Sequence, residues 1–320
     1  YNYMNEYISI IATHQARIRC FLNNLFEKYN LDKNNDYYNE NNEIYRFKNS
    51  CILKIIITNN NTKIELFHDG KIDEEKPNYI YFSNLKNNNL QQVYDNQNNL
   101  KYSQKNFKTI SINENIFNVD ENKYIFYLLR HGQGYHNTLE GFEKSESLYL
   151  PGFRENILDA SLTSLGINQA KEAGNKLNDI TFDYYFASDL KRTRQTLLKA
   201  FENKKLDEKE IIILPCNHEV NYPKCDKLTL ITPNENVSSC QKDNDEGCGS
   251  ANWDYYKEKY NGNYRSSILS IPYRDCSNIN IISEAIKIIK DKKDKNIQKG
   301  GYFKKYLKYK HKYLKLKNNN

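Results

Sequence analysis

The chain has 320 residues, with 47 Lys and Arg against 40 Asp and Glu, which gives a net charge of +7. From Lys287 to the end, 13 Lys and two Asp give +11, so the rest of the chain carries −4. A nucleic-acid-binding fold carries its positive charge within the folded domain. The mildly acidic body therefore argues against that class, and the length allows one large domain or two small ones.

Targeting segments and metal motifs are not evident in the sequence. The longest apolar runs, such as 55–57, are far shorter than a bilayer span, and the first residues do not resemble a signal peptide. Seven cysteines, an odd number, do not form the pattern of a disulfide framework. We therefore expect free thiols, no metal and no cofactor. The alternative is a zinc site assembled from Cys216, His218, Cys225, Cys240 and Cys248, although no C-x-x-C pair is present.

The first third of the chain predicts a strand, a helix and a hairpin. Apolar residues predict a strand at 6–12, and helical spacing predicts a helix from Ala16 to about Tyr29. After an Asn-rich loop at 30–43, two strands at 50–58 and 62–68 flank Asn59-Asn60-Asn61 as a hairpin. Residues 84–122 are rich in Asn, Gln and Lys, with a weak strand signal at 109–112, and are interpreted as a linker or surface excursion.

From residue 124 onward, strands and helices alternate. The segments, in order, are a continuously apolar strand at 124–129, a helix capped by Thr163, a strand at 182–187, a helix at 189–201 and a strand at 211–214. Helices are also expected at 253–260 and 279–289, after an irregular insertion at 221–250. This alternation predicts an α/β fold, a three-layer α/β/α sandwich with a largely parallel central sheet.

Two segments place cationic side chains directly after predicted strands. Arg130-His131-Gly132 follows the strand at 124–129, and ligands in open α/β sheets bind beyond the carboxyl ends of the strands. Residues 188–196 (Ser-Asp-Leu-Lys-Arg-Thr-Arg-Gln-Thr) follow the next strand and open a helix, which offers N–H groups and a guanidinium to an anion. Together they favour a phosphate site, whereas the three-residue motif alone also fits a histidine that caps a strand end.

Between these segments, residues 159–170 (Asp-Ala-Ser-Leu-Thr-Ser-Leu-Gly-Ile-Asn-Gln-Ala) supply a third motif. The set resembles the histidine phosphatase superfamily, which has the phosphoglycerate-mutase-like fold. That family shows Arg-His-Gly, then a Leu-Thr-x-x-Gly-x-x-Gln-Ala helix, then Ser-x-Leu-x-Arg-x-x-x-Thr. The resemblance implies a phosphoglycerate-mutase-like sandwich and phosphoryl transfer through a phosphohistidine.

The resemblance also implies residue roles. His131 would be the nucleophile, Arg130 and Arg192 would bind the phosphoryl oxygens, and Glu219 would donate a proton and then activate water. The substrate-binding candidates are Asn137, Gly132, Gln133 and His136. Before Glu219 this chain has Cys-Asn-His where the family more often has Arg, so a solvated loop carboxylate is the alternative there.

The family also needs a second histidine opposite the nucleophile. Downstream of Glu219 only His311 occurs, in the basic tail. The strand–histidine–helix pattern at 8–17, with His14, resembles the missing part, and the hairpin after it resembles what normally follows. The alternative is that His14 is a structural histidine at a strand end.

We therefore expect one circularly permuted domain at 1–290. Its parts would be the family's C-terminal part at 5–83, a linker at 84–122, the N-terminal catalytic part at 123–220, and an insertion with helices at 221–290. Permutation is tolerated where the original termini lie close together and a linker can join them.

A basic Lys/Tyr-rich tail is expected at 291–320. Tyr and Leu recur at helical spacing from Tyr302 to Leu316, with lysines between them. The tail predicts contact with an anionic surface or a partner, or is a solvated basic tail. It is similar to tails of giant-virus proteins. We expect a cytoplasmic protein, in the host cytoplasm or the virion if viral, that is neither secreted nor membrane-spanning.

Three functions remain open at this point. The first is a metal-independent phosphatase that hydrolyses phosphorylated small molecules or phosphoproteins. The second is a phosphoglycerate mutase-type phosphotransferase, and the third is a catalytically silent protein that binds phosphorylated ligands.

Overall fold

A computed structural model describes residues 5–29, 47–70, 109–137, 159–214, 217, 219, 251–255 and 281–294. The chain divides into two compact units, residues 1–281 and 282–320. In the second unit, the described residues 282–294 are helical, as the sequence predicted for 279–289. The predicted start of the tail at 291 falls within this helix.

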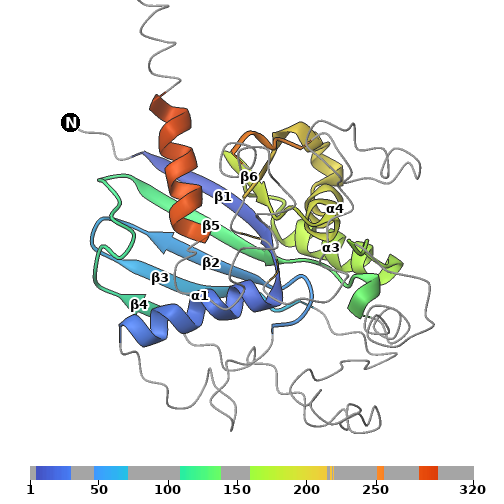
Figure 1. Cartoon of the computed structure of the whole chain (residues 1–320), viewed down its shortest axis with the longest axis horizontal. Helices are drawn as coiled ribbons and strands as arrows, with labels where there is room; N and C mark the ends of the chain where they lie inside the picture. Colours follow the sequence, from blue (N-terminus) through green and yellow to red (C-terminus); the bar gives the residue numbers. More distant parts are fainter. Residues whose placement is uncertain are drawn as a thin grey trace, which may run out of the picture. The chain divides into compact units, whose positions relative to one another are not determined.

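A seven-stranded sheet forms the centre of the first unit, in the order β4-β3-β2-β5-β1-β6-β7 (Figure 1). The strands are β1 (Glu6–Thr13), β2 (Ile52–Ile57), β3 (Thr62–His68), β4 (Ile110–Ile112), β5 (Lys123–Arg130), β6 (Tyr184–Ala187) and β7 (Ile211–Ile213). β5, β1, β6 and β7 pair in parallel, whereas β2, β3 and β4 add antiparallel pairings. Because β3 runs in the direction of β5, only β2 and β4 run the opposite way. The sheet is mixed and largely parallel, and the predicted α/β class is confirmed.

Helices cover both faces of the sheet. They are α1 (Gln15–Lys28), α3 (Ser164–Lys176) and α4 (Lys191–Ala200). Alternate residues of β1 and β5 pack with residues of α3 and α4 in one core cluster that includes Ile10, Tyr127, Ala173 and Leu197. α1 buries a stripe, including Ile18 and Leu22, that does not belong to that cluster, and α1 contacts β5. Since side chains alternate across a strand, α1 occupies the other face, which gives three layers.

The position of β1 in the sheet differs from its position in the chain. β1 lies between β5 and β6, in register with both: Thr13 is beside Arg130, and Ala12 is beside Ala187. The N-terminal strand is therefore an interior strand of the sheet, and Ile10, Ile11 and Ala12 are completely buried. A continuous apolar run suits such a position.

Part of the segment predicted as a linker is built into the sheet. Ile110 and Ile112 are buried and Ser111 is exposed, and β4 pairs antiparallel with β3 at the sheet edge. The expectation of a surface linker over 84–122 is therefore wrong for residues 110–112. Three residues that alternate between buried and exposed are only a weak indication of a strand. The strand forms here because these residues pair with β3. Residues 84–108 lie outside the described ranges, as do 30–43, 221–250 and 256–260.

The cysteine prediction also needs correction. Cys20 on α1 is disulfide-bonded, although the sequence led us to expect free thiols. Spacing along the chain does not reveal which cysteines meet in space. Cys51 is free and fully buried, and burial raises the pKa of its thiol to about 12. It is therefore not a nucleophile at neutral pH.

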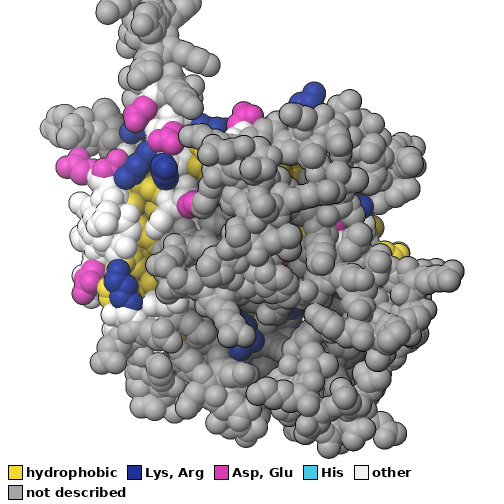
Figure 2. All heavy atoms as spheres, viewed as in Figure 1, with side chains coloured by type: hydrophobic (Ala, Val, Ile, Leu, Met, Phe, Trp, Pro, Cys, Tyr) yellow, Lys and Arg dark blue, Asp and Glu magenta, His cyan; other side chains and the backbone are white. Residues whose placement is uncertain are grey.

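Charges of both signs occur side by side on the described part of the face shown in Figure 2. Surface ion pairs in the described ranges include Lys123–Glu6 at 2.6 Å and Lys63–Glu65 at 2.7 Å. This distribution does not form a basic patch on that part of the surface. In the ranges that the structure describes, no helix is long and apolar enough to cross a bilayer.

Candidate active site

Two histidines follow neighbouring parallel strands at the same edge of the sheet. Because Thr13 is in register with Arg130, His14 and His131 come directly after paired residues. Their ring centroids are 5.2 Å apart with a 62° angle between the planes, and the N–H of His131 donates to the carbonyl of Thr13 at 3.0 Å. The structure thus brings together two residues that the sequence separates by 117 positions.

His131 is almost completely buried and its ring orientation is fixed. Nδ1 lies 2.6 Å from the carbonyl oxygen of Gly132, which can only accept, so Nδ1 carries a proton and Nε2 presents its lone pair. Burial, with the positive charges of Arg192 and Arg130, holds the pKa of His131 well below its usual value of 6.5. The imidazole is therefore neutral at physiological pH, as nucleophilic attack requires.

Gly132 and Gly166 allow the loop that carries His131 to lie directly on α3. A Cβ at Gly132 would meet the carbonyl oxygen of Gly166 at 2.3 Å, and a Cβ at Gly166 would meet that of Gln133 at 2.1 Å. Thr163 caps α3 by accepting from the N–H of Gly166 and donates to the side chain of Gln133 at 2.8 Å. The glycines of the first two motifs therefore serve close backbone packing, which positions His131.

The start of α4 supplies the second arginine. Arg192 is fully buried, and its charge acts on His131. Thr196 couples the helix to the loop, because its hydroxyl donates to the carbonyl of Arg192 at 2.7 Å and accepts from the N–H of Gly132 at 3.1 Å. The first N–H of the helix, that of Lys191, donates to the carboxylate of Asp159 at 2.7 Å.

Arg130, at the end of β5, contacts the segment before β2 and also acts on His131. Its guanidinium Nη1 donates to the carbonyl of Phe47, and its backbone N–H donates to Cys51 at 3.0 Å. Its charge contributes to the low pKa of His131. Arg130 is thus fixed against the segment before β2 while keeping positive charge beside His131.

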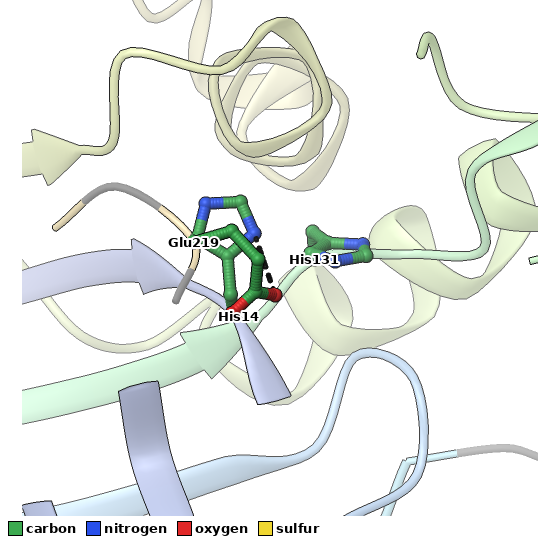
Figure 3. A group of neighbouring side chains, drawn as sticks. All are labelled: His14, His131 and Glu219. Carbon is green, nitrogen blue, oxygen red and sulfur yellow. Dashed lines mark ion pairs between the residues drawn. The ribbon is translucent and has the colours of Figure 1, made fainter. Parts of the chain in front are cut away.

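Glu219 completes the cluster from the segment after β7. Its carboxylate oxygen lies 3.6 Å from Nδ1 of His14, an ion pair when that histidine is protonated (Figure 3). Asn217 anchors this segment: its amide accepts from the hydroxyl of Thr13 at 2.6 Å and donates to the carbonyl of Ala12 at 2.8 Å. The end of β1 therefore positions both His14 and the carboxylate.

The other predicted residues have different positions. Asn137 accepts from the N–H of Gly134 at 3.1 Å within a short 3-10 turn, Tyr135–Asn137. Gln133 is buried, and its side chain accepts a hydrogen bond from the hydroxyl of Thr163. The side chain of His136 and the cysteines at 216, 225, 240 and 248 lie outside the described part of the chain.

Three residues beside the site were not assigned a role from the sequence. Ser188 lies 2.7 Å from Nε2 of His14, Asn217 fixes the segment of Glu219, and Asp159 caps α4. Ser188 and Asp159 were visible as motif positions, but their partners depend on contacts distant in sequence. Asn217 gave no signal, because an isolated Asn between a strand and a Glu is an ordinary loop residue.

A buried neutral histidine, two arginines, a second histidine and a carboxylate at the carboxyl edge of an α/β sheet form an arrangement that suits phosphoryl transfer. Among the described residues, His14, His131 and Glu219 could also hold a metal ion, since one ligand atom from each lies within 4.8 Å of the others.

Residues 126–247 match the family model of the histidine phosphatase superfamily (branch 1). This segment is therefore similar to the histidine phosphatase superfamily, and the similarity supports phosphatase or phosphotransferase activity in general. The matched segment contains His131, Arg192 and Glu219, whereas His14 lies outside it. The comparisons with curated proteins and with solved structures give no match.

Proposed function

We propose that this chain hydrolyses phosphomonoesters through a phosphohistidine on His131. The observation that carries this proposal is the fixed ring of His131, whose Nδ1–H is held by the Gly132 carbonyl, in one cluster with His14 and Glu219 (Figure 3).

In the first step, the lone pair of His131 Nε2 forms a bond to phosphorus and the bond to the leaving oxygen breaks. Glu219 donates its proton to that oxygen, so the alcohol leaves neutral. Arg192, Arg130 and protonated His14 bind the phosphoryl oxygens, where their positive charge stabilises the transition state.

In the second step, Glu219, now a carboxylate, removes a proton from water. The water oxygen bonds to phosphorus, the N–P bond breaks, and inorganic phosphate leaves. The net reaction consumes one water per ester and needs no metal, and the proton that Glu219 takes from water replaces the one that it gave to the alcohol.

We also propose that the domain is circularly permuted. β1, α1 and the β2–β3 hairpin would then be the family's C-terminal part placed first. The support is that β1 is an interior strand beside β5 and presents its histidine at the nucleophile, although it lies outside the matched segment.

The test is turnover of an aryl phosphate in the presence of a chelator, with His131→Ala compared with His68→Ala, a histidine on β3. We expect the wild type and His68→Ala to be active and His131→Ala to lose about 10⁴-fold or more in kcat, as the loss of a nucleophile does. Mass spectrometry should detect an acid-labile phosphate on the peptide that contains His131.

Each other outcome contradicts the proposal. Full activity of His131→Ala would exclude this nucleophile. Phosphate binding without turnover would favour the silent binding protein, and transfer to a second hydroxyl in preference to water would favour a mutase.

A further inference from the structure

Three buried side chains from three separate elements converge at the site in Figure 3. His14 follows β1, His131 follows β5, and Glu219 follows β7. One ligand atom of each lies within 4.8 Å of those of the other two, and all three residues are buried. Two imidazoles and one carboxylate form a ligand set that zinc uses in proteins.

Hydrogen bonds orient both rings for a shared ligand. His131 donates through Nδ1 to the carbonyl of Gly132 at 2.6 Å, which leaves the lone pair on Nε2. A second partner that holds the opposite ring nitrogen is the usual support of a metal-binding histidine.

The tautomer of His14 follows from the hydroxyls behind it. Thr193 donates its hydroxyl proton to the carbonyl of Leu190 at 2.8 Å, so its oxygen accepts from the hydroxyl of Ser188 at 3.0 Å. Ser188 has then used its only proton and accepts from Nε2–H of His14 at 2.7 Å. In neutral His14, therefore, the lone pair is on Nδ1, the atom 3.6 Å from the carboxylate of Glu219.

We propose that His14, His131 and Glu219 bind one divalent transition-metal ion, with zinc preferred, and that the ion inhibits the chain by occupying the nucleophile. Bonds of 2.0–2.2 Å in tetrahedral geometry separate ligand atoms by about 3.3 Å. The Nδ1–carboxylate pair, at 3.6 Å, is already close to that separation, and the ligand atoms of the whole set lie within 4.8 Å of one another, so binding draws the three side chains closer together.

The two arginines influence which fourth ligand the ion takes. Arg192 and Arg130 lower the affinity for a cation by repulsion, while the charge of Glu219 opposes them. Their guanidinium groups favour an anion, such as hydroxide or phosphate, in the remaining position. Zinc should therefore bind more tightly when inorganic phosphate is present.

The inhibition rests on the proposed function, whereas the binding does not. A metal on Nε2 of His131 uses the same lone pair that would attack phosphorus, so the two bonds exclude each other. Zinc should lower the turnover of an aryl phosphate, and a chelator should restore it fully.

The experiment titrates the metal-free full chain with Zn²⁺ by calorimetry and with Co²⁺ by visible absorption, a probe of tetrahedral coordination. We expect one tight site, with affinity reduced at least about tenfold in His14→Gln and in Glu219→Gln. Ser188→Ala, which removes the hydrogen bond to His14 together with those to Thr193 and to the N–H of Leu190, should weaken binding about tenfold. His68→Gln is the matched control and should bind as the wild type does.

An unchanged affinity in both His14→Gln and Glu219→Gln would overturn the site, and so would the absence of a cobalt spectrum. Metal binding by a chain that shows no turnover would support the site and contradict the proposed function. Full turnover with zinc bound at this stoichiometry would overturn the inhibition and leave the proposed phosphatase intact.

Discussion

The segments 6–68 and 123–219 contribute residues to one site, but they differ in how clearly the sequence identifies those residues. The second segment falls largely within the family match and carries His131, Arg192 and Glu219 in recognisable motifs. The first segment lies outside the match, and its His14 has no motif beyond strand, histidine and helix. Yet β1 lies in the middle of the sheet, between β5 and β6. A segment without a recognisable motif can therefore lie as close to the site as a segment that matches a family model.

The largest expected effect on this comparison comes from His14→Ala. We expect kcat for an aryl phosphate to fall by about 10³-fold, because a positioned donor to the phosphoryl oxygens is lost. Steady-state kinetics and thermal unfolding should be measured together. Activity within about threefold of the wild type would mean that His14 is only a structural residue at a strand end, and the permutation proposal would fall with it.

The second comparison sets Arg192→Ala against Arg194→Ala. Arg194 is fully buried, its guanidinium lies 5.3 Å from the ring of Trp253, and its charge acts on the buried Asp159. We expect Arg192→Ala to cost about 10²-fold or more in kcat. Arg194→Ala should instead lose about 3 kcal/mol of stability, because the buried carboxylate of Asp159 loses the largest of its compensating charges.

Urea unfolding and kinetics on both variants distinguish the two roles. Equal and mild effects on activity would show that the wrong arginine has been assigned to the phosphate. A large loss of activity in a fully stable Arg194→Ala would lead to the same conclusion.

A smaller effect is expected from Asn217→Ala. Its amide joins the segment of Glu219 to β1 by two buried hydrogen bonds, so its loss should misplace the carboxylate and lower kcat about tenfold, with KM little changed. Thr13 would also lose a buried partner, at about 1–3 kcal/mol of stability. Asn60→Ala, on the exposed hairpin turn, is the control and should change neither quantity. A loss of stability with normal kcat would show that Asn217 does not position Glu219.

The smallest effect concerns pH. Since burial and two arginines hold the pKa of His131 well below 6.5, the ring stays neutral as pH falls through 6.5. An unperturbed histidine would be about 90% protonated one unit lower. Between pH 6.5 and 5.5, kcat/KM should therefore decrease by less than about twofold on account of His131.

NMR titration of the histidine rings, with His131→Gln for assignment, measures this directly. In Arg192→Gln the pKa of His131 should rise, because one repelling charge is removed, and the ring should then titrate at higher pH. A His131 that titrates near 6.5 in the wild type would contradict the buried, neutral nucleophile.

Much of the fold could be predicted because its elements are long and periodic. The apolar run at 124–129, the Thr163 cap and the hairpin at 52–68 are local features, and local interactions decide them. β4 could not be predicted with the same certainty, since three alternating residues become a strand only when a partner such as β3 is present. The disulfide of Cys20 likewise depends on contacts that no spacing encodes.

The sequence by itself determined the local parts of the site: a histidine after a buried strand, arginines at a strand end and a helix start, and the glycines that let the loop lie on α3. These are short-range consequences of side-chain type and backbone sterics. Only the tertiary structure decided that β1 pairs between β5 and β6 in a register that sets His14 beside His131. Only the tertiary structure, too, decided that Asn217 fastens Glu219 to the same strand and that Ser188 orients the His14 ring. Parallel pairing joins residues far apart in the chain through backbone hydrogen bonds that every sequence can make. The choice of partner and register therefore depends on the burial of the whole sheet rather than on any one motif.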